Sequence, residues 1–355
     1  MSDDEIDAIR AWRPPDAPAA DDGSIATARQ RLAAHIAGRT GTPPPRRRRR
    51  LVIAIPGLVT AAVLATVLVL GSGADDGRVL PQTATALESS ARNFERTATG
   101  TTLGNRRGFL YTRSSGTVEG CSVSRIRGTG GMLSVCARER SEREDWVSPH
   151  TDGLILERRG RIGWMTAEDR QRWIAAGRPD VSRSFPVRRS RTPLPPSEVY
   201  VGNEQVNDGG AALSRLGPNA LYQRIYDGVE DGQGESRAGE AFTQIADALR
   251  EGLIVPQLQA NLYRALAHVP GVLYRGDERD RLGRAVNVFA KTDAGSRHEL
   301  LLDPSSGAML GERKVLAEDR PASGDPAPPA QKAGTVIEDM LIIRRAVVAA
   351  RGDRP

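Results

Sequence analysis

The residue types that most often carry chemistry are sparse and scattered in this chain. None of the four histidines has a metal-ligand partner at the spacings that zinc sites use; they are His35, His150, His268 and His298. The segment that begins at Asp227 resembles a calcium loop, but its twelfth position holds Ala238 instead of a glutamate. A dinucleotide-binding glycine pattern and a Gly-x-Ser-x-Gly sequence are both missing. The sequence therefore predicts no catalytic residue, no metal, no cofactor and no enzyme, and the alternative is a site that folding assembles from distant residues.

Cys121 and Cys136 are the only cysteines, and a disulfide between them is the covalent chemistry that the sequence predicts. They lie in two strand-like runs around residues 128–131, Gly-Thr-Gly-Gly, which is typical of a hairpin. A two-residue turn at 128–129 pairs residues whose numbers sum to 257, as 121 and 136 do, so the two side chains face each other. A four-residue turn would place them diagonally, and two free buried thiols are the alternative.

A 20-residue apolar segment, residues 51–70, organises the rest of the chain. It has no charged residue, and its only polar side chains are Thr60 and Thr66. A helix of this length is about 30 Å long, the thickness of a bilayer's hydrocarbon core. In lipid, a helix satisfies every backbone amide within the segment. We expect one transmembrane helix in the lipid bilayer, with a fully buried core helix as the alternative.

The residues on either side of this span predict its orientation. Asp75 and Asp76 follow it, and five arginines precede it, namely Arg46, Arg47, Arg48, Arg49 and Arg50. Arginines beside a span are retained in the cytoplasm, so we expect residues 1–45 inside and residues 71–355 outside the cell membrane. A cleaved signal peptide is the alternative, although its apolar core would be shorter. The predicted disulfide then lies on the oxidising side, where disulfides persist.

The net charge of +6 does not indicate a nucleic-acid partner. The first 50 residues hold 10 basic and 7 acidic side chains, so the rest carry 40 and 37, which is close to balance. Only three of the 50 basic residues are lysine, a skew typical of a high-GC bacterial genome. The arginine run lies directly beside an apolar span, so we interpret it as a topology signal with some attraction to anionic lipid.

The predicted cytosolic segment, residues 1–45, has an apolar stripe but is too short to bury a core. At helical spacing, four apolar side chains of residues 24–37 lie on one side, namely Ile25, Ala28, Leu32 and Ile36. Either this segment is largely disordered, or the stripe binds a cytosolic partner.

Beyond the span we expect a linker at residues 71–82 and one α+β domain at residues 83–350. Periodicity predicts helices at residues 83–96, 168–175, 218–226, 238–251 and 256–268. Strand-like runs lie at residues 109–113, 121–127, 132–138, 272–274, 285–291, 297–302 and 308–316, with another hairpin in residues 146–165. Residues 178–196 combine five arginines with five prolines, which predicts a solvated loop between two halves. Residues 335–348 fit a strand or a helix. We expect a curved, mainly antiparallel sheet with the helices of residues 218–268 packed against it.

Two stretches carry a resemblance to a known family. These are AFTQIADALREGLIVPQLQANLYRALAHVPGV at residues 241–272 and LLDPSSGAMLGERKVL at residues 301–316. With the leader and the anchor, they resemble a largely uncharacterised family of actinobacterial single-pass membrane proteins, often encoded near extracytoplasmic-function sigma factors. The resemblance covers the leader, the anchor and about residues 215–320. It implies a regulatory or envelope-sensing role and carries no catalytic residues over to this chain.

Two functions of different classes follow as expectations. In the first, the outer domain senses an envelope ligand of unknown identity, and the inner segment binds a cytosolic transcription regulator such as a sigma factor. In the second, the outer domain carries a hydrophobic envelope ligand in an open apolar cavity, and the inner segment has no output. The apolar stripe discriminates between them, because only the sensor needs it.

Overall fold

The computed structural model describes residues 79–98, 102–104, 106–125, 132–160, 162–179, 188–230, 232–322 and 329–355. All of them belong to one compact unit, Gly71–Pro355. In these ranges no helix is both long and apolar enough to cross a membrane. The predicted span at residues 51–70 and the predicted cytosolic segment, with its stripe and arginine run, lie outside the described residues.

The domain is built on one ten-stranded sheet, and all its neighbouring strands pair antiparallel. The order is β5-β3-β2-β1-β12-β11-β10-β9-β8, with β4 beside β2. The strands are β1 (Phe109–Arg125), β2 (Met132–Val147), β3 (Gly153–Arg159), β4 (Gly163–Trp164), β5 (Arg188–Leu194), β8 (Val272–Arg279), β9 (Ala285–Asp293), β10 (Ser296–Leu302), β11 (Met309–Leu316) and β12 (Val336–Val348). A small separate ribbon pairs β6 (Tyr200–Val201) with β7 (Glu204–Gln205). The predicted α+β class with a mainly antiparallel sheet is confirmed.

Local sequence signals set the bounds of the helices. The α-helices are α3 (Pro81–Thr97), α4 (Ala167–Ala175), α5 (Pro218–Asp227), α6 (Arg237–Glu251) and α7 (Pro256–Leu266), and short 3-10 turns occupy Asp208–Gly210 and Leu213–Arg215. Proline occupies the first turn of α3, α5 and α7, where its missing N–H costs no helical hydrogen bond. Ser236 caps the start of α6, and Gly252 ends it with a left-handed φ of 66°.

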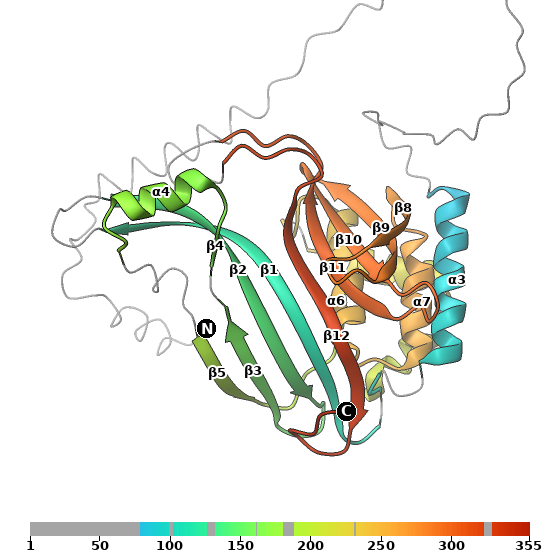
Figure 1. Ribbon diagram of the computed structural model, residues 1–355. Coiled ribbons are helices and arrows are strands. Elements are labelled where there is room, and N and C mark those ends of the chain that lie inside the picture. The colour runs from blue at the N-terminus through green and yellow to red at the C-terminus, as the bar shows by residue number, and fades with distance from the viewer. Residues whose placement is uncertain are drawn as a thin grey trace, which may run out of the picture. The chain divides into compact units, whose positions relative to one another are not determined.

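The helices cover only one half of the sheet. Figure 1 shows α3, α6 and α7 beside the β8–β12 half, whereas β1, β2, β3 and β5 extend away from them. The main core lies under the helices, and its large members include Phe94, Phe242, Leu249, Tyr263 and Phe289. A smaller cluster on the other face of the sheet surrounds Trp146, and a third lies under α4. Part of the sheet's inner face is therefore left without a helix above it.

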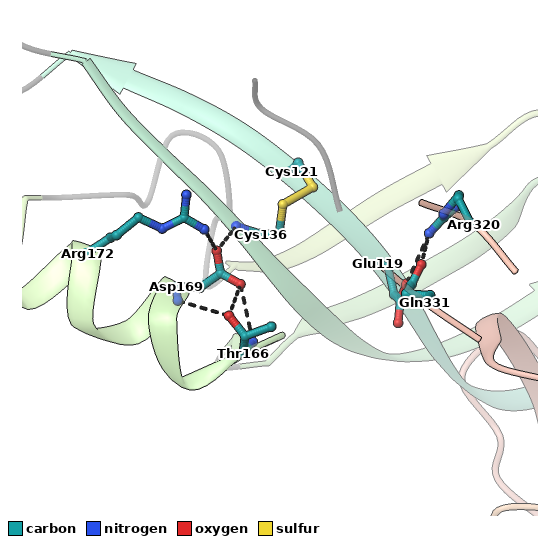
Figure 2. Close-up of a disulfide and its surroundings, with 8 residues drawn as sticks. All are labelled: Glu119, Cys121, Cys136, Thr166, Asp169, Arg172, Arg320 and Gln331. Carbon is teal, nitrogen blue, oxygen red and sulfur yellow. Dashed lines mark hydrogen bonds and ion pairs between the residues drawn. A yellow bond between two sulfur atoms is a disulfide. The ribbon is translucent and has the colours of Figure 1, made fainter. Parts of the chain in front are cut away.

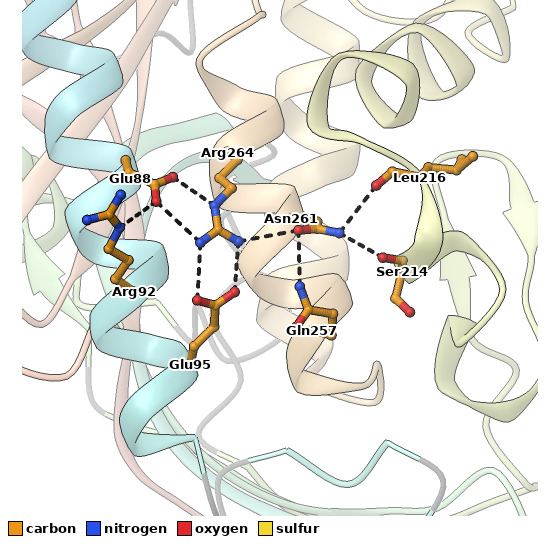
Figure 3. A network of polar contacts seen from close by, with 8 residues as sticks. All are labelled: Glu88, Arg92, Glu95, Ser214, Leu216, Gln257, Asn261 and Arg264. Atoms are coloured by element: carbon orange, nitrogen blue, oxygen red, sulfur yellow. Dashed lines mark hydrogen bonds and ion pairs between the residues drawn. The ribbon is translucent and has the colours of Figure 1, made fainter.

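Arg264 on α7 joins α3 to the rest of the helical layer. Its guanidinium donates to Glu88 at 2.7 Å and to Glu95 at 2.8 and 3.1 Å, two carboxylates spaced two turns apart on α3. Asn261, on the same helix, donates to the carbonyl oxygens of Ser214 and Leu216 (Figure 3). The hydrogen bonds from Arg264 lower the pKa values of Glu88 and Glu95. The first described helix is thus held to the domain by a forked ion pair as well as by apolar packing.

Two sequence predictions need correction. Residues 109–113 and 121–127 were expected as separate strands, but β1 runs unbroken through the Ser- and Gly-containing segment between them. That segment pairs with β2 on one side and with β12 on the other, which overcomes its weak strand propensity. Residues 188–194 were expected in a loop but form β5, an edge strand on β3, where Pro193 is tolerated. Residues 335–348, left open between strand and helix, contain strand β12.

Candidate ligand cleft

A cleft of about 810 Å³ opens on the inner face of the sheet, beside the C-terminal end of α6. Its floor comes from β1, β2 and β12, and its walls come from the end of α6 and from residues 194–198. Strand alternation explains the floor. Thr112 lies opposite both Asp145 and Arg345, and Ser114 lies opposite both Arg143 and Ile342, so these side chains share one face. The floor also has the apolar side chains Val147, Met340 and Ile342, and Leu253 lines the cleft just after the end of α6.

Arg345 is the central cation of this cleft. Its guanidinium donates to the backbone carbonyl oxygens of Leu249 and Arg250, at the C-terminal end of α6, and to the Thr112 hydroxyl. A cation at a helix C-terminus is favoured by the helix dipole. Gly252 permits the approach, because a Cβ there would lie 3.1 Å from an Arg345 nitrogen. Withdrawal from solvent lowers the pKa of Arg345 to about 10, so it remains charged at neutral pH.

The charges that line the cleft sum to a net negative value. Three arginines, Arg143, Arg250 and Arg345, face five carboxylates, namely Asp145, Glu198, Glu251, Glu312 and Glu338. Two ion pairs neutralise part of this set, Arg143 with Asp145 at 2.6 Å and Arg250 with Glu312 at 2.5 Å. Burial raises the pKa of Asp145 in spite of its arginine partner. Among the described residues, Arg345, Glu251 and Glu338 have no ion-pair partner within 4 Å, so the cleft offers one deep cation and a carboxylate rim.

A narrower pocket of about 210 Å³ continues along α6 and shares Arg250, Glu312, Glu338 and Met340 with the cleft. His298 lies in this pocket, and burial lowers its pKa, so its imidazole is neutral at pH 7. No local pattern in the sequence singles out any residue of the cleft. The chain has 47 arginines, and only strand pairing across more than 200 residues brings Arg345 to Thr112.

The predicted disulfide is present between Cys121 and Cys136. The two residues lie directly opposite each other on β1 and β2, in the register that the hairpin pattern predicted. Figure 2 shows the buried carboxylate of Asp169 beside this strand pair, where it accepts from the Cys136 backbone N–H at 3.1 Å and from Arg172 at 2.6 Å. Asp169 also completes a capping box with Thr166 at the start of α4. The Thr-x-x-Asp spacing was the sequence signal that could have identified Asp169.

The remaining predicted site residues lie outside the described part of the chain. The stripe Ile25, Ala28, Leu32 and Ile36 and the arginines Arg46 to Arg50 precede the first described residue. Among the described residues, no group of three or more His, Cys, Asp or Glu side chains is arranged to hold a metal ion. No protein-family model matches the chain, and a search of curated proteins finds no match.

Proposed function

We propose that this chain is a membrane-anchored sensor of the cell envelope whose outer domain binds a small cationic amphiphile in the cleft beside α6. The observation that carries the proposal is the lining of the cleft, which combines several apolar side chains with carboxylates that the arginines of the cleft only partly neutralise. Its volume lies within the range of small-molecule sites.

The same lining supports the sensor over the carrier among the two functions expected from the sequence. A carrier of a hydrocarbon needs an open apolar cavity, whereas this cleft is lined by eight charged side chains. Burying an alkyl chain alone against unpaired charges would cost desolvation energy without compensation. A ligand with an ammonium group can pair with Glu251 or Glu338 and place its apolar part on Met340 and Ile342. The geometry therefore supports recognition of a charged ligand over carriage of a hydrophobe.

The full chain in neutral-lipid nanodiscs, titrated calorimetrically with hexylamine against a blank of empty nanodiscs, tests the binding. We expect hexylamine to bind more tightly than hexanoate or hexanol. Replacing Glu251→Gln together with Glu338→Gln should weaken hexylamine binding about tenfold, since two rim charges of about 0.7 kcal/mol each are lost. The matched control, Glu235→Gln with Glu318→Gln, removes two exposed carboxylates outside the cleft and should change nothing. Equal binding of hexylamine and hexanol would contradict the proposal.

The output of the sensor is proposed to be the apolar stripe of the leader, received in a groove of a cytosolic transcription regulator. Burying one such side chain is worth about 1.5–3 kcal/mol, so Leu32→Asp with Ile36→Asp should weaken partner binding tenfold or more. Transcription of the partner's targets under envelope stress should change, while membrane insertion stays normal. Unchanged transcription in both this variant and a deletion of residues 1–40 would favour the carrier function.

A further inference from the structure

A second charged surface lies on the opposite face of the sheet from the cleft. It is a shallow depression of about 930 Å³ over β1, β2, β3, β5 and β12. Seven exposed arginines line it. Arg143 pairs with Asp145 and also lines the cleft, and Arg354 pairs with Glu144. We call the other five the arginine face, namely Arg113, Arg158, Arg189, Arg191 and Arg344.

Strand pairing places like charges directly opposite each other on this face. Arg113 pairs with Arg344 across β1 and β12, and Arg158 pairs with Arg189 across β3 and β5. Side chains in such positions lie about 5 Å apart at Cβ, and like charges there are destabilising. On β2, Arg113 lies opposite Glu144, and Arg158 lies opposite Glu142. Arg189 and Arg344 have only an arginine directly opposite them in the described strand pairs.

The carboxylates nearby neutralise the arginine face only in part. Glu142 is 3.7 Å from Arg113, and Glu144 pairs with Arg354 at 2.8 Å, where the hydrogen bond from Arg354 lowers the pKa of Glu144 to about 2. Within the described part of the chain, Arg158, Arg189, Arg191 and Arg344 form no ion pair. The surface therefore keeps four forked cationic groups turned to solvent, a geometry suited to phosphate oxygens.

The surface is also amphipathic. Ile343, an extra residue at the bulge where β12 pairs with β1, is 39% exposed and lies beside Arg344. Half-buried Leu156 lies among the arginines. Apolar side chains between arginines are typical of a surface that rests at the boundary of headgroups and acyl chains.

We infer that the arginine face binds the phosphate headgroups of an anionic bilayer and holds the domain against the membrane surface. The predicted span ends at residue 70 and α3 begins at Pro81, so the connection reaches at most about 35 Å. If the span is as predicted, the domain never leaves the vicinity of the headgroups. Each arginine near an anionic surface contributes favourably, and the attraction falls off within a Debye length.

Sedimentation with vesicles in trans tests this inference. The full chain in phosphatidylcholine nanodiscs is mixed with phosphatidylglycerol vesicles or with phosphatidylcholine vesicles. We expect binding to the anionic vesicles only, and a loss of about tenfold or more for Arg158→Gln with Arg344→Gln. The control, Arg170→Gln with Arg215→Gln, removes the same charge from exposed positions elsewhere and keeps the arginine run of the leader. It should bind as the unaltered chain does.

The melting temperature of the double glutamine variant shows whether these arginines bind lipid or stabilise the fold. Arg158 lies opposite Arg189 on one side and opposite Glu142 on the other, so these two cross-strand effects oppose each other, while Arg344 lies opposite Arg113. The double variant should therefore melt at about the same temperature while it binds less. Lysine at both positions keeps the charge and should retain most of the binding. The inference is overturned if the double glutamine variant binds like the control, if both vesicle types bind equally, or if soluble polyphosphate binds the face and anionic vesicles do not. Hexylamine binding in the cleft is measured separately and should be unaffected.

Discussion

At the scale of single residues, the Cys121–Cys136 pair shows how far a local argument can reach. The register of a hairpin depends on its turn length, and the strands themselves preserve that register over the whole β1–β2 pair. The disulfide closes a loop of 15 residues near the far end of this ribbon, where α4 rather than the main helical layer packs on the sheet. It therefore fixes a part of the molecule that has little core of its own.

Removing the disulfide should lower the free energy of unfolding by about 3 kcal/mol on the chain-entropy model. Guanidinium unfolding of the chain with and without reductant measures this. The variant Cys121→Ser with Cys136→Ser should unfold like the reduced chain and should not respond to reductant. Two reactive thiols in the denatured, unreduced chain would contradict the bond.

At the scale of elements, α3 is docked mainly through α7. The core contacts include Phe94 against the Tyr263 ring, with centroids 5.7 Å apart, and the fork of Arg264 links Glu88 and Glu95. Without Arg264, Glu88 and Glu95 on the same face of α3 would lose the guanidinium that they share. Since α3 is the first described helix after the predicted span, this junction is where a force between anchor and domain would act.

Arg264→Gln should destabilise the domain by about 1–3 kcal/mol at neutral pH, because charge-assisted hydrogen bonds are lost. The pKa values of Glu88 and Glu95 are lowered in the folded state, so their contribution is present above the unfolded value of 4.5 and is lost as the pH falls through the folded values. The variant should therefore lose less stability than the unaltered chain on acidification below pH 4.5. Urea unfolding at a series of pH values measures both effects.

Arg92→Gln is the control for this prediction. Arg92 pairs with Glu88 within α3, and its side chain is 71% exposed, so its loss should cost about 0.5 kcal/mol or less. An equal loss in the free energy of unfolding for the two substitutions would show that the ion pairs of Arg264 add nothing beyond apolar packing.

At the scale of the whole molecule, one sheet presents two chemically different faces. The inner face carries the helical layer and the cleft, and the outer face of β1, β3, β5 and β12 carries the arginines. The two proposals therefore assign the ligand to one face of the sheet and the anionic bilayer to the other. Both proposals depend on the domain being outside the cell.

The prediction for the whole molecule concerns the orientation of the chain in the membrane. The five arginines before residue 51 should retain the leader in the cytoplasm, so an alkaline phosphatase fusion at Asp76 should be active and one at Gly41 inactive. Replacing Arg46 to Arg50 by glutamine should reduce the difference between the two fusions. The opposite activities in the unaltered chain would reverse the orientation and remove the basis for both proposals.

The local features of this protein could be read from the sequence because each depends on neighbours in the chain. Prolines and Gly252 mark the helix ends, and the strand-like runs at residues 297–302 and 308–316 are found as β10 and β11. The turn at residues 128–129 predicts the cysteine register. In each case the deciding interaction spans only a few residues, and a few residues of sequence are enough to specify it.

The cleft and the arginine face could not be predicted from local sequence, because they form only in the tertiary structure. Both depend on the pairing of β1 with β12, which joins residues more than 200 positions apart, and on β5, an edge strand whose own composition favours a loop. The bulge at Ile343 sets which β12 side chains point to each face, and no local pattern encodes that choice. Nonlocal strand pairing is selected by the burial of the whole sheet, so the two surfaces exist only once all of its strands are in place.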